Sequence, residues 1–581
     1  MNESVQTTST NGWRTWLSPR VAELRRRESQ VFLVLALVIG ALTGLAVVAF
    51  IVLTERLGMR LYPVGGAPWR RLLFPVVGSL GVGYLLYRYF PNARGSGVPQ
   101  TKAALFAREG RITLRTVLGK FFCTSVTLAS GIPLGREGPS VQVGAGIGSV
   151  LGRLLGLPTE QVKKLIPVGA AAAIAAAFNT PLAAVLFSLE EITGDLYAPV
   201  MGAVVLASAT AWMVLRVLLG DHPLFKVPQY QLIHPAEFAV YAVLGVTGGV
   251  VSAAFTKLLL GIRARFLRFP QKTVWFHPVA GGLLVGVMGW FVPQVLGVGY
   301  GFVGEALNGR MAFRLMALLV VLKLVAVTTS YATGNAGGIF GPSLFIGAML
   351  GGTVGTVAHH LFPAHTATPG AYALVGMGAV FAGVVRAPMT SVLMIFEMTQ
   401  DYAVIVPLMI ANLVSLFIAS QLQHEPIYEG LAMQDGIHLP SPETRQRYGQ
   451  RQVIKVMQTA TESLPAEITV REARERVRSS KFRTWLVTDR RGVIGVINFA
   501  TLEQELALGQ DKEGADKKVG ELVDAMVFPH VHPDQGLDLA LERMGANQIE
   551  ILPVVNRADV HKLEGMVTLR DVLDAYGVSR A

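Results

Sequence analysis

Residues 120–140 read KFFCTSVTLASGIPLGREGPS, and residues 323–343 read KLVAVTTSYATGNAGGIFGPS. Both stretches begin with a lysine and end in Gly-x-x-Gly-Pro-Ser, and they align without a gap, from 120 to 323, at an offset of 203. Further along, residues 181–190 (PLAAVLFSLE) match residues 388–397 (PMTSVLMIFE) at an offset of 207. Two matches in the same order indicate a chain built from two repeated halves. Generic similarity between apolar sequences is the alternative.

The repeated stretches lie in an unusually apolar chain. Of its 581 residues, 51% are hydrophobic and only 15% are charged, whereas about 25% is usual in soluble proteins. Residues 421–581 contain 20 Lys and Arg and 24 Asp and Glu, a net charge of −4, so residues 1–420 carry +16 of the total of +12. This split predicts a membrane-embedded part followed by a soluble domain. The positive charge is therefore not a nucleic-acid footprint.

Two kinds of apolar segment alternate along the first 420 residues. Continuous segments of about 20 residues predict membrane-spanning helices; they cover 31–54, 72–89, 200–219, 238–260, 278–295, 315–331 and 404–421. Other apolar segments are interrupted by Gly and Pro: 117–156, 166–189, 337–357 and 371–396. Broken helices are tolerated in a membrane only where they face protein or a polar cavity. Broken segments at corresponding positions of two halves predict a transporter with its site between the halves.

The glycine-rich breaks also indicate the charge of the ligand. A helix that begins inside the membrane presents unpaired N–H groups and a partial positive charge. Glycine lets a ligand approach that backbone closely. Such a site favours a small anion and needs no lysine or arginine.

Three glycine-rich pieces, GSGVP (95–99), GREGP (135–139) and GGIFGP (337–342), occur in this order and are followed by Tyr428. Together they resemble the CLC family of chloride channels and proton-coupled chloride exchangers, over residues 31–430. The only departure in the first motif is Val98 in place of isoleucine. The resemblance implies a mostly α-helical, polytopic membrane protein of two inverted repeats with broken helices, and a homodimer. Chloride and protons would be its transported ions.

The resemblance also implies where chloride binds. Hydroxyl groups of Ser96 and Tyr428 and backbone N–H groups of Ile339 and Phe340 would face a central chloride. Backbone N–H groups at Gly135, Arg136 and Gly138 would face an outer anion. Serine in the first motif favours chloride, because nitrate-preferring relatives tend to carry proline there and fluoride exporters methionine. A turn hydroxyl for Ser96 and an interfacial side chain for Tyr428 are the alternatives.

Two glutamates are candidates for moving protons. Glu137 is a carboxylate in glycine-rich membrane sequence, where charges are costly and usually functional; the resemblance makes it the gating glutamate and outer proton site. An ion pair with adjacent Arg136 is a poor alternative, because neighbouring helix residues do not face each other. Glu190 has a repeat counterpart in Glu397, which suggests a shared structural role. Glu191 aligns with Met398, and the resemblance makes it the inner proton glutamate; a charge at the cytoplasmic rim is the alternative.

The tail contains a repeat of its own. Residues 492–498 (GVIGVIN) and 563–568 (LEGMVT) both predict a short strand that enters a helix, and the tail resembles a pair of CBS domains of the α/β class. Such pairs often bind adenine nucleotides through a Thr/Ser-x-x-Asp sequence at a helix start. The second copy keeps this sequence as Thr568 and Asp571, whereas the first copy has Asn498 and Thr501 and lacks the aspartate, so the resemblance implies at most one such site. A helix cap with a first-turn aspartate is the alternative.

These patterns divide the chain into five parts: a cytoplasmic N-terminal segment (1–30), a transport domain (31–430), a linker (431–452), a first CBS domain (453–510) and a second (517–577). Arginines before the first span predict cytoplasmic termini in an inner (plasma) membrane. The single cysteine, Cys123, excludes an intramolecular disulfide and a thiolate metal cluster, and we expect no metal and no required cofactor. Proton–chloride antiport is favoured; a passive chloride channel is the alternative, and a membrane-embedded enzyme a remote one.

Overall fold

The computed structural model describes residues 12–575 apart from a few short gaps: 64, 196–199, 221–222, 226, 229, 231–232, 438–451, 460–461, 479, 481, 509–516, 524–527 and 548. Side chains are described from residue 30 onward. All but the last side chain of the predicted cytoplasmic segment 1–30, and most of the predicted linker 431–452, therefore lie outside the described residues. The chain divides into two compact units, Met1–Leu439 and Pro440–Ala581.

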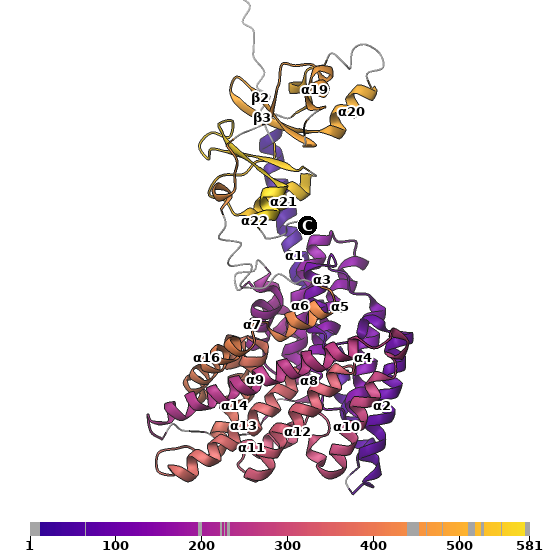
Figure 1. Cartoon of the computed structure of the whole chain (residues 1–581), viewed down its shortest axis with the longest axis vertical. Coiled ribbons are helices and arrows are strands. Elements are labelled where there is room, and N and C mark those ends of the chain that lie inside the picture. Colours follow the sequence, from indigo (N-terminus) through magenta and orange to yellow (C-terminus); the bar gives the residue numbers. More distant parts are fainter. Residues whose placement is uncertain are drawn as a thin grey trace, which may run out of the picture. The chain divides into compact units, whose positions relative to one another are not determined.

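The N-terminal unit is helical and its two halves contain the same series of helices. The first half runs α1 (Gly12–Leu61), α2 (Trp69–Arg88), α3 (Val98–Phe106), α4 (Leu114–Ala129), α5 (Glu137–Leu154), α6 (Thr159–Phe178), α7 (Pro181–Phe187) and α8 (Met201–Leu219). The second half runs α9 (Glu237–Leu267), α10 (His277–Phe291), α11 (Tyr300–Leu307), α12 (Phe313–Ala332), α13 (Phe340–Leu361), α14 (Pro369–Val385), α15 (Pro388–Thr399) and α16 (Ile405–Leu422). A last helix, α17 (Ile427–Gln434), follows. The two halves lie beside each other, with α2 against α10 (Figure 1). Helix α7 also packs against α15.

Three of the four predicted broken segments are interrupted where Gly, Pro and left-handed residues fall, whereas segment 337–357 is a short loop followed by the unbroken helix α13 from Phe340. Segment 117–156 becomes α4 and α5, separated by the loop 130–136. Segment 166–189 breaks at Asn179 (φ 60°) and segment 371–396 breaks at Arg386 (φ 64°), and a proline starts the next helix two residues later in both. A proline at the first helical position lacks only an N–H that would be unpaired anyway. The prediction of a mostly helical membrane protein with repeated, broken helices is confirmed.

Close helix crossings repeat in the two halves. A Cβ on Gly144 of α5 would lie 2.2 Å from the carbonyl oxygen of Gly169 on α6. In the second half, a Cβ on Gly347 of α13 would lie 2.3 Å from the carbonyl oxygen of Gly376 on α14. Small residues that let backbones touch are the usual basis of helix packing in membranes. The glycine excess of the sequence is therefore used for packing as well as for breaks.

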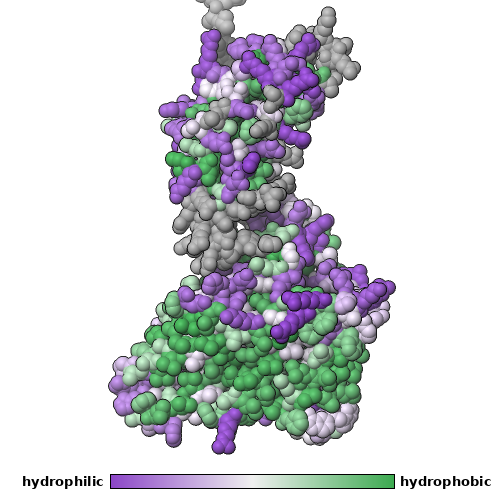
Figure 2. All heavy atoms as spheres, viewed as in Figure 1, coloured by the Kyte–Doolittle hydropathy of each residue, from purple (hydrophilic) through white to green (hydrophobic). Residues whose placement is uncertain are grey.

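The surface of this unit suits a lipid environment. Among the described residues, seven helices are long and apolar enough to cross a membrane. Figure 2 shows hydrophobic residues gathered in a broad band over the helices of this unit, with hydrophilic residues above and below the band. Exposed side chains within these helices include Leu45, Val217, Val321 and Phe417. Large exposed apolar areas are rare on soluble proteins, so the chain is a membrane protein.

The C-terminal unit is a small α/β structure with two similar modules. The first contains β1 (Ser463–Pro465), α19 (Val470–Val477), β2 (Thr484–Asp489), β3 (Gly492–Asn498) and α20 (Phe499–Leu508). The second contains α21 (Leu537–Asn547), β4 (Ile551–Val555), β5 (Leu563–Thr568) and α22 (Leu569–Ala575). Strand β2 pairs parallel with β1 and antiparallel with β3, and β4 pairs antiparallel with β5. In the second module a single parallel bridge, Val531 to Val554, stands where β1 stands in the first.

Candidate functional site

The N-terminal ends of three helices, α3, α5 and α13, meet inside the N-terminal unit, and each helix is preceded by a glycine-containing loop. The loops before α5 and α13 are joined by a reciprocal pair of hydrogen bonds: each of Gly135 and Gly338 donates its N–H to the other's carbonyl, both at 2.7 Å. The loop before α3 lies against them, since a Cβ on Gly138 would be 2.6 Å from the carbonyl oxygen of Ser96. Three partial positive charges thus converge, as the glycine pattern predicts.

Ser96 occupies an unusual position in this cluster. Its side chain is fully buried, and its hydroxyl oxygen has no hydrogen-bond partner among the described residues. Its backbone N–H donates to the hydroxyl oxygen of Tyr331 at 3.1 Å. A turn serine that satisfied its own backbone would not leave its hydroxyl unpaired, so that alternative is wrong. A buried hydroxyl without a partner is costly, so the Ser96 hydroxyl is available to donate a hydrogen bond to a ligand bound at this point.

The remaining members of the predicted chloride site are buried around the same point. Tyr428, on the first turn of α17, is 1% exposed, so it is a core residue and not an interfacial tyrosine. Ile339 and Phe340 are also fully buried. The ring of Phe340 packs against three others, with centroid distances of 5.0, 5.4 and 4.3 Å to Phe178, Phe187 and Phe381. Helices from both halves therefore enclose the site with apolar rings.

Glu137 is fully buried at the start of α5, and its carboxylate reaches across to the second half. One oxygen accepts from the N–H of Gly341 in α13 at 3.2 Å. The other accepts a short hydrogen bond from the hydroxyl of Tyr300. Arg136 points elsewhere, with its guanidinium 3.5 Å from Glu55 and over the ring of Tyr300. The carboxylate thus occupies a position that suits a small anion.

The sequence analysis did not identify Tyr300 as a site residue, although a repeated glycine motif marks its position. The sequence Gly297-Val298-Gly299-Tyr300 repeats Gly95-Ser-Gly-Val98 at an offset of 202. Both glycines of each copy have positive φ, 88° and 107° in the first and 62° and 88° in the second. The loop that carries the buried serine in one half therefore carries, in the other half, the tyrosine that holds Glu137.

The aligned lysines of the two repeats hold these two loops. Lys120 donates to the carbonyl of Gly95 at 2.7 Å, and Lys323 donates to the carbonyl of Gly297 at 2.6 Å. Both lysines are fully buried. A buried ammonium is tolerated only with oxygen partners, and these carbonyls supply them. The lysine pair therefore fixes the loops on which Ser96 and Tyr300 lie.

Glu191 lies on a π-helical turn, η2 (Ser188–Thr193), that follows α7. Its carboxylate is 2.8 Å from the ammonium of Lys102 on α3, and Lys102 is also 3.4 Å from Glu429 on α17. Glu191 is 11% exposed, so it is a buried, paired carboxylate and not a rim charge. Lys102 and Glu429 were missed, although each is a charged residue in a short apolar helix sequence (VPQTKAALF and IYEGLAMQ).

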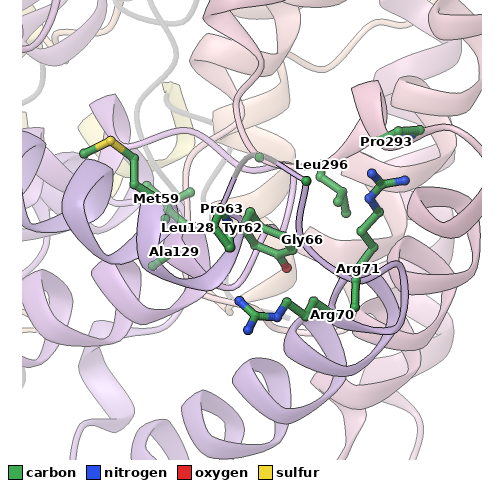
Figure 3. A pocket seen from close by; sticks show the side chains of 15 residues that line it. Met59, Tyr62, Pro63, Gly66, Arg70, Arg71, Leu128, Ala129, Pro293 and Leu296 are labelled. Atoms are coloured by element: carbon green, nitrogen blue, oxygen red, sulfur yellow. The ribbon is translucent and has the colours of Figure 1, made fainter.

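A cavity of about 490 Å³ lies where α1 ends and α2 begins. Figure 3 shows the side chains of Arg70 and Arg71 at this cavity, together with Tyr62. The hydroxyl of Tyr62 donates to the carbonyl of Ser130 at 2.6 Å. Gly131 and Gly297, from the loops that lead to Glu137 and Tyr300, also line the cavity, but Glu137 does not. Two guanidinium groups at such an opening raise the local anion concentration.

In the C-terminal unit, Thr568 and Asp571 lie together at the start of α22. The Asp571 carboxylate accepts from the Thr568 N–H at 3.0 Å and the Thr568 hydroxyl at 2.7 Å. Its other oxygen accepts from the side chain of Gln458 at 2.8 Å. In the first module Asn498 caps α20 in a comparable way through Thr501, at 2.8 Å. These contacts are those of a helix cap.

The fold and the site define a polytopic membrane protein in which the N-terminal ends of three helices meet, between two repeats, around the buried, unpaired hydroxyl of Ser96. The chain belongs to the CLC family: the model described as voltage gated chloride channel matches residues 78–420. The model described as CBS domain matches residues 519–577. This family consists of transporters and channels, so the membrane-embedded enzyme is excluded.

Curated relatives agree with this membership. A protein of Vibrio campbellii named H(+)/Cl(-) exchange transporter ClcA is 34% identical over 354 residues, 60% of this chain and 76% of the relative. A protein of the same name from Salmonella paratyphi B is 32% identical over 443 residues, 71% of this chain and 93% of the relative. The crystal structure of a slow cyanobacterial Cl−/H+ antiporter superposes with a TM-score of 0.64 at 28% identity, over 70% of this chain and 97% of that one.

Proposed function

We propose that this protein exchanges chloride for protons across a membrane. The names of the Vibrio and Salmonella relatives and of the cyanobacterial structure support this activity. The observation that carries it is the position of the Glu137 carboxylate, which accepts from the Gly341 N–H between the two repeats. A tethered carboxylate there competes with chloride for the same donors.

Chloride binding follows from the chemistry of the site. The central ion would accept from the hydroxyls of Ser96 and Tyr428 and from the N–H groups of Ile339 and Phe340. The outer anion would accept from N–H groups at Gly135, Arg136 and Gly138. Hydroxyls and amides can replace the water around a halide without a full positive charge that would trap it. The unpaired hydroxyl of Ser96 supports this assignment.

Proton coupling requires Glu137 to change places with the anion. When its carboxylate takes a proton it loses its charge, and its attraction to the Gly341 N–H and the helix N-terminal ends weakens. The neutral side chain then leaves and chloride takes its position. Glu191, paired with Lys102 of α3, would pass protons to and from the opposite side of the membrane. A passive channel needs no such second carboxylate.

The remaining assignments belong to the same proposal. Glu137 would face the outside and Glu191 the cytoplasm of a bacterial inner membrane, with both termini cytoplasmic. The protein would work as a homodimer with one transport path in each subunit. Binding of an adenine nucleotide at Thr568 and Asp571 stays a prediction, and a nucleotide there would have to displace Gln458 from Asp571.

The proposal is tested by replacing Glu137 in protein reconstituted into liposomes. Glu137→Ala should still carry chloride but should carry no protons with it, because the protonatable competitor is gone. Glu55→Gln, which alters an exposed carboxylate near the same site, is the matched control and should remain coupled. Proton transport at the normal chloride-to-proton ratio in Glu137→Ala would remove Glu137 from the mechanism.

A further inference from the structure

Three charged side chains from three separate elements form one buried cluster at the Glu191 end of the site. Lys102 of α3 lies between Glu191 of η2 and Glu429 of α17, at 2.8 and 3.4 Å. The three side chains are 4%, 11% and 9% exposed. The second oxygen of Glu429 is buried and has no hydrogen-bond partner among the described residues.

The cluster lies on the two elements that carry the hydroxyls of the proposed chloride site. α3 follows directly on the loop of Ser96, and Glu429 is the neighbour of Tyr428 in α17. Any rearrangement of the three charges therefore acts on both elements that carry the hydroxyls of the central anion site. A purely structural ion pair would need only one carboxylate for one lysine.

The charge of the cluster decides how readily it takes a proton. With both carboxylates ionised, the cluster carries one net negative charge in a buried place, where an uncompensated charge is unfavourable. One added proton makes it neutral. If Glu429 were neutral, Lys102 and Glu191 would form a closed pair, and protonating Glu191 would leave the lysine buried without a counter-charge.

We propose that Glu429 is the charge-balancing residue of the inner proton site: by engaging Lys102, it leaves Glu191 free to take up and release a proton. This inference rests on the proposed role of Glu191. Glu429 is a positioning residue in this scheme, because it acts on Glu191 through Lys102.

Other charged groups near the cluster have partners of their own. The carboxylate of Glu190 accepts from the Thr390 N–H at 2.8 Å. Arg263 of α9 is 2.5 Å from Asp435, beyond the end of α17. The guanidinium of Arg386 donates to the carbonyl of His424 at 2.7 Å. Glu190 keeps its charge, because its partners are neutral N–H and hydroxyl donors, and it adds the same negative charge beside Glu191 in the wild type and in each variant of the cluster.

The test uses the full chain in liposomes and measures protons moved per chloride. Glu429→Gln should lower this ratio several-fold while chloride turnover remains, because Glu191 and Lys102 then form a closed ion pair that resists protonation. The double variant Lys102→Met/Glu429→Gln should regain the wild-type ratio, because it leaves Glu191 as a lone carboxylate. Glu425→Gln, which alters an exposed carboxylate just before α17, is the matched control and should behave as wild type.

Two outcomes overturn the inference. One is an unchanged ratio in Glu429→Gln. The other is a double variant as impaired as Glu429→Gln, or more so, since that is what a role in folding alone predicts. Glu191→Gln in the same assay tests the proposed function separately: retained coupling there removes Glu191 itself, whereas loss there with an unaffected Glu429→Gln overturns only the role of Glu429.

Discussion

Glu190 and Glu397 exchange contacts between the two repeats. Glu190 holds the first turn of α15, which carries Glu397, and Glu397 holds the first turn of α7, which continues into the turn that carries Glu190. The Glu190 carboxylate accepts from the N–H groups of Met389 and Thr390 at 3.4 and 2.8 Å, at the start of α15. The Glu397 carboxylate accepts from the N–H groups of Leu182 and Ala183 at 2.9 and 2.7 Å, at the start of α7. A carboxylate at a helix N-terminus satisfies unpaired donors and complements the dipole.

This exchange predicts a loss of stability without a loss of coupling. Glu190→Gln or Glu397→Gln should lower stability by about 1–2 kcal/mol, because charge-assisted hydrogen bonds at a helix start are replaced by weaker ones. Thermal unfolding in detergent measures the change. Glu160→Gln, which alters an exposed pair with Lys163, should cost less. Equal losses for all three variants would contradict the capping role, and so would an altered proton-to-chloride ratio in the first two.

Tyr300 should control how tightly Glu137 occupies its position. Tyr300→Phe removes the hydroxyl that donates to the carboxylate and keeps the ring that packs on Phe225. We expect chloride turnover to rise several-fold, in line with the loss of one hydrogen bond to a charged group, with coupling retained. Stopped-flow or electrode recordings of chloride efflux from liposomes measure it. Tyr84→Phe, at an exposed tyrosine, is the control; equal turnover in both variants would mean that the hydroxyl does not hold Glu137.

Ser96 should matter for chloride and not for folding. Because its hydroxyl has no protein partner among the described residues, Ser96→Ala should leave the melting temperature nearly unchanged and weaken chloride binding measured by calorimetry. The matched control is Ser149→Ala, which breaks hydrogen bonds with Gly110 and Ile112 at 2.5 and 3.0 Å. It should destabilise the protein by about 1 kcal/mol or more. A lower melting temperature with unchanged chloride binding in Ser96→Ala would mean that the anion does not bind at this hydroxyl.

The hydrogen bond between Gln458 and Asp571 leads to a prediction about nucleotide binding in the C-terminal unit. If an adenine nucleotide binds at Asp571, Gln458→Ala should strengthen its binding, because this substitution frees an oxygen that the glutamine now occupies. Titration of the full-length protein with ATP measures the affinity. Binding that is unchanged in Gln458→Ala, or that survives Asp571→Ala, would place the nucleotide at another site. Asp571→Ala should in either case weaken the start of α22 by about 1 kcal/mol.

Much of the fold could be predicted because its signals are local. The breaks at Asn179 and Arg386 follow from short sequence motifs that both halves share. Glu137 could be identified because a carboxylate in glycine-rich membrane sequence is itself unusual. The shared role of Glu190 and Glu397 was visible as an alignment, although the exchange between halves was not.

The residues that the sequence did not reveal, Lys102, Glu429 and Tyr300, act through contacts that no single segment contains. Lys102, Glu191 and Glu429 come from three elements spread over 327 residues, so their pairing depends on tertiary packing. Tyr300 lies in a glycine loop whose repeat was concealed, because Val298 replaces the serine of the first copy. Periodicity and spacing report on segments, and clusters of this kind form only when the halves meet.

The central claim is that chloride and protons move in opposite directions through one site. Its most direct test is a chloride gradient across liposomes that contain the protein, with no initial pH gradient and the membrane potential held at zero. The account predicts that chloride flow drives protons uphill in the opposite direction, and that the proton movement disappears in Glu137→Ala while chloride flow continues. Chloride flow without any proton movement in the wild-type protein, at both acidic and neutral pH, would contradict exchange and identify a passive channel.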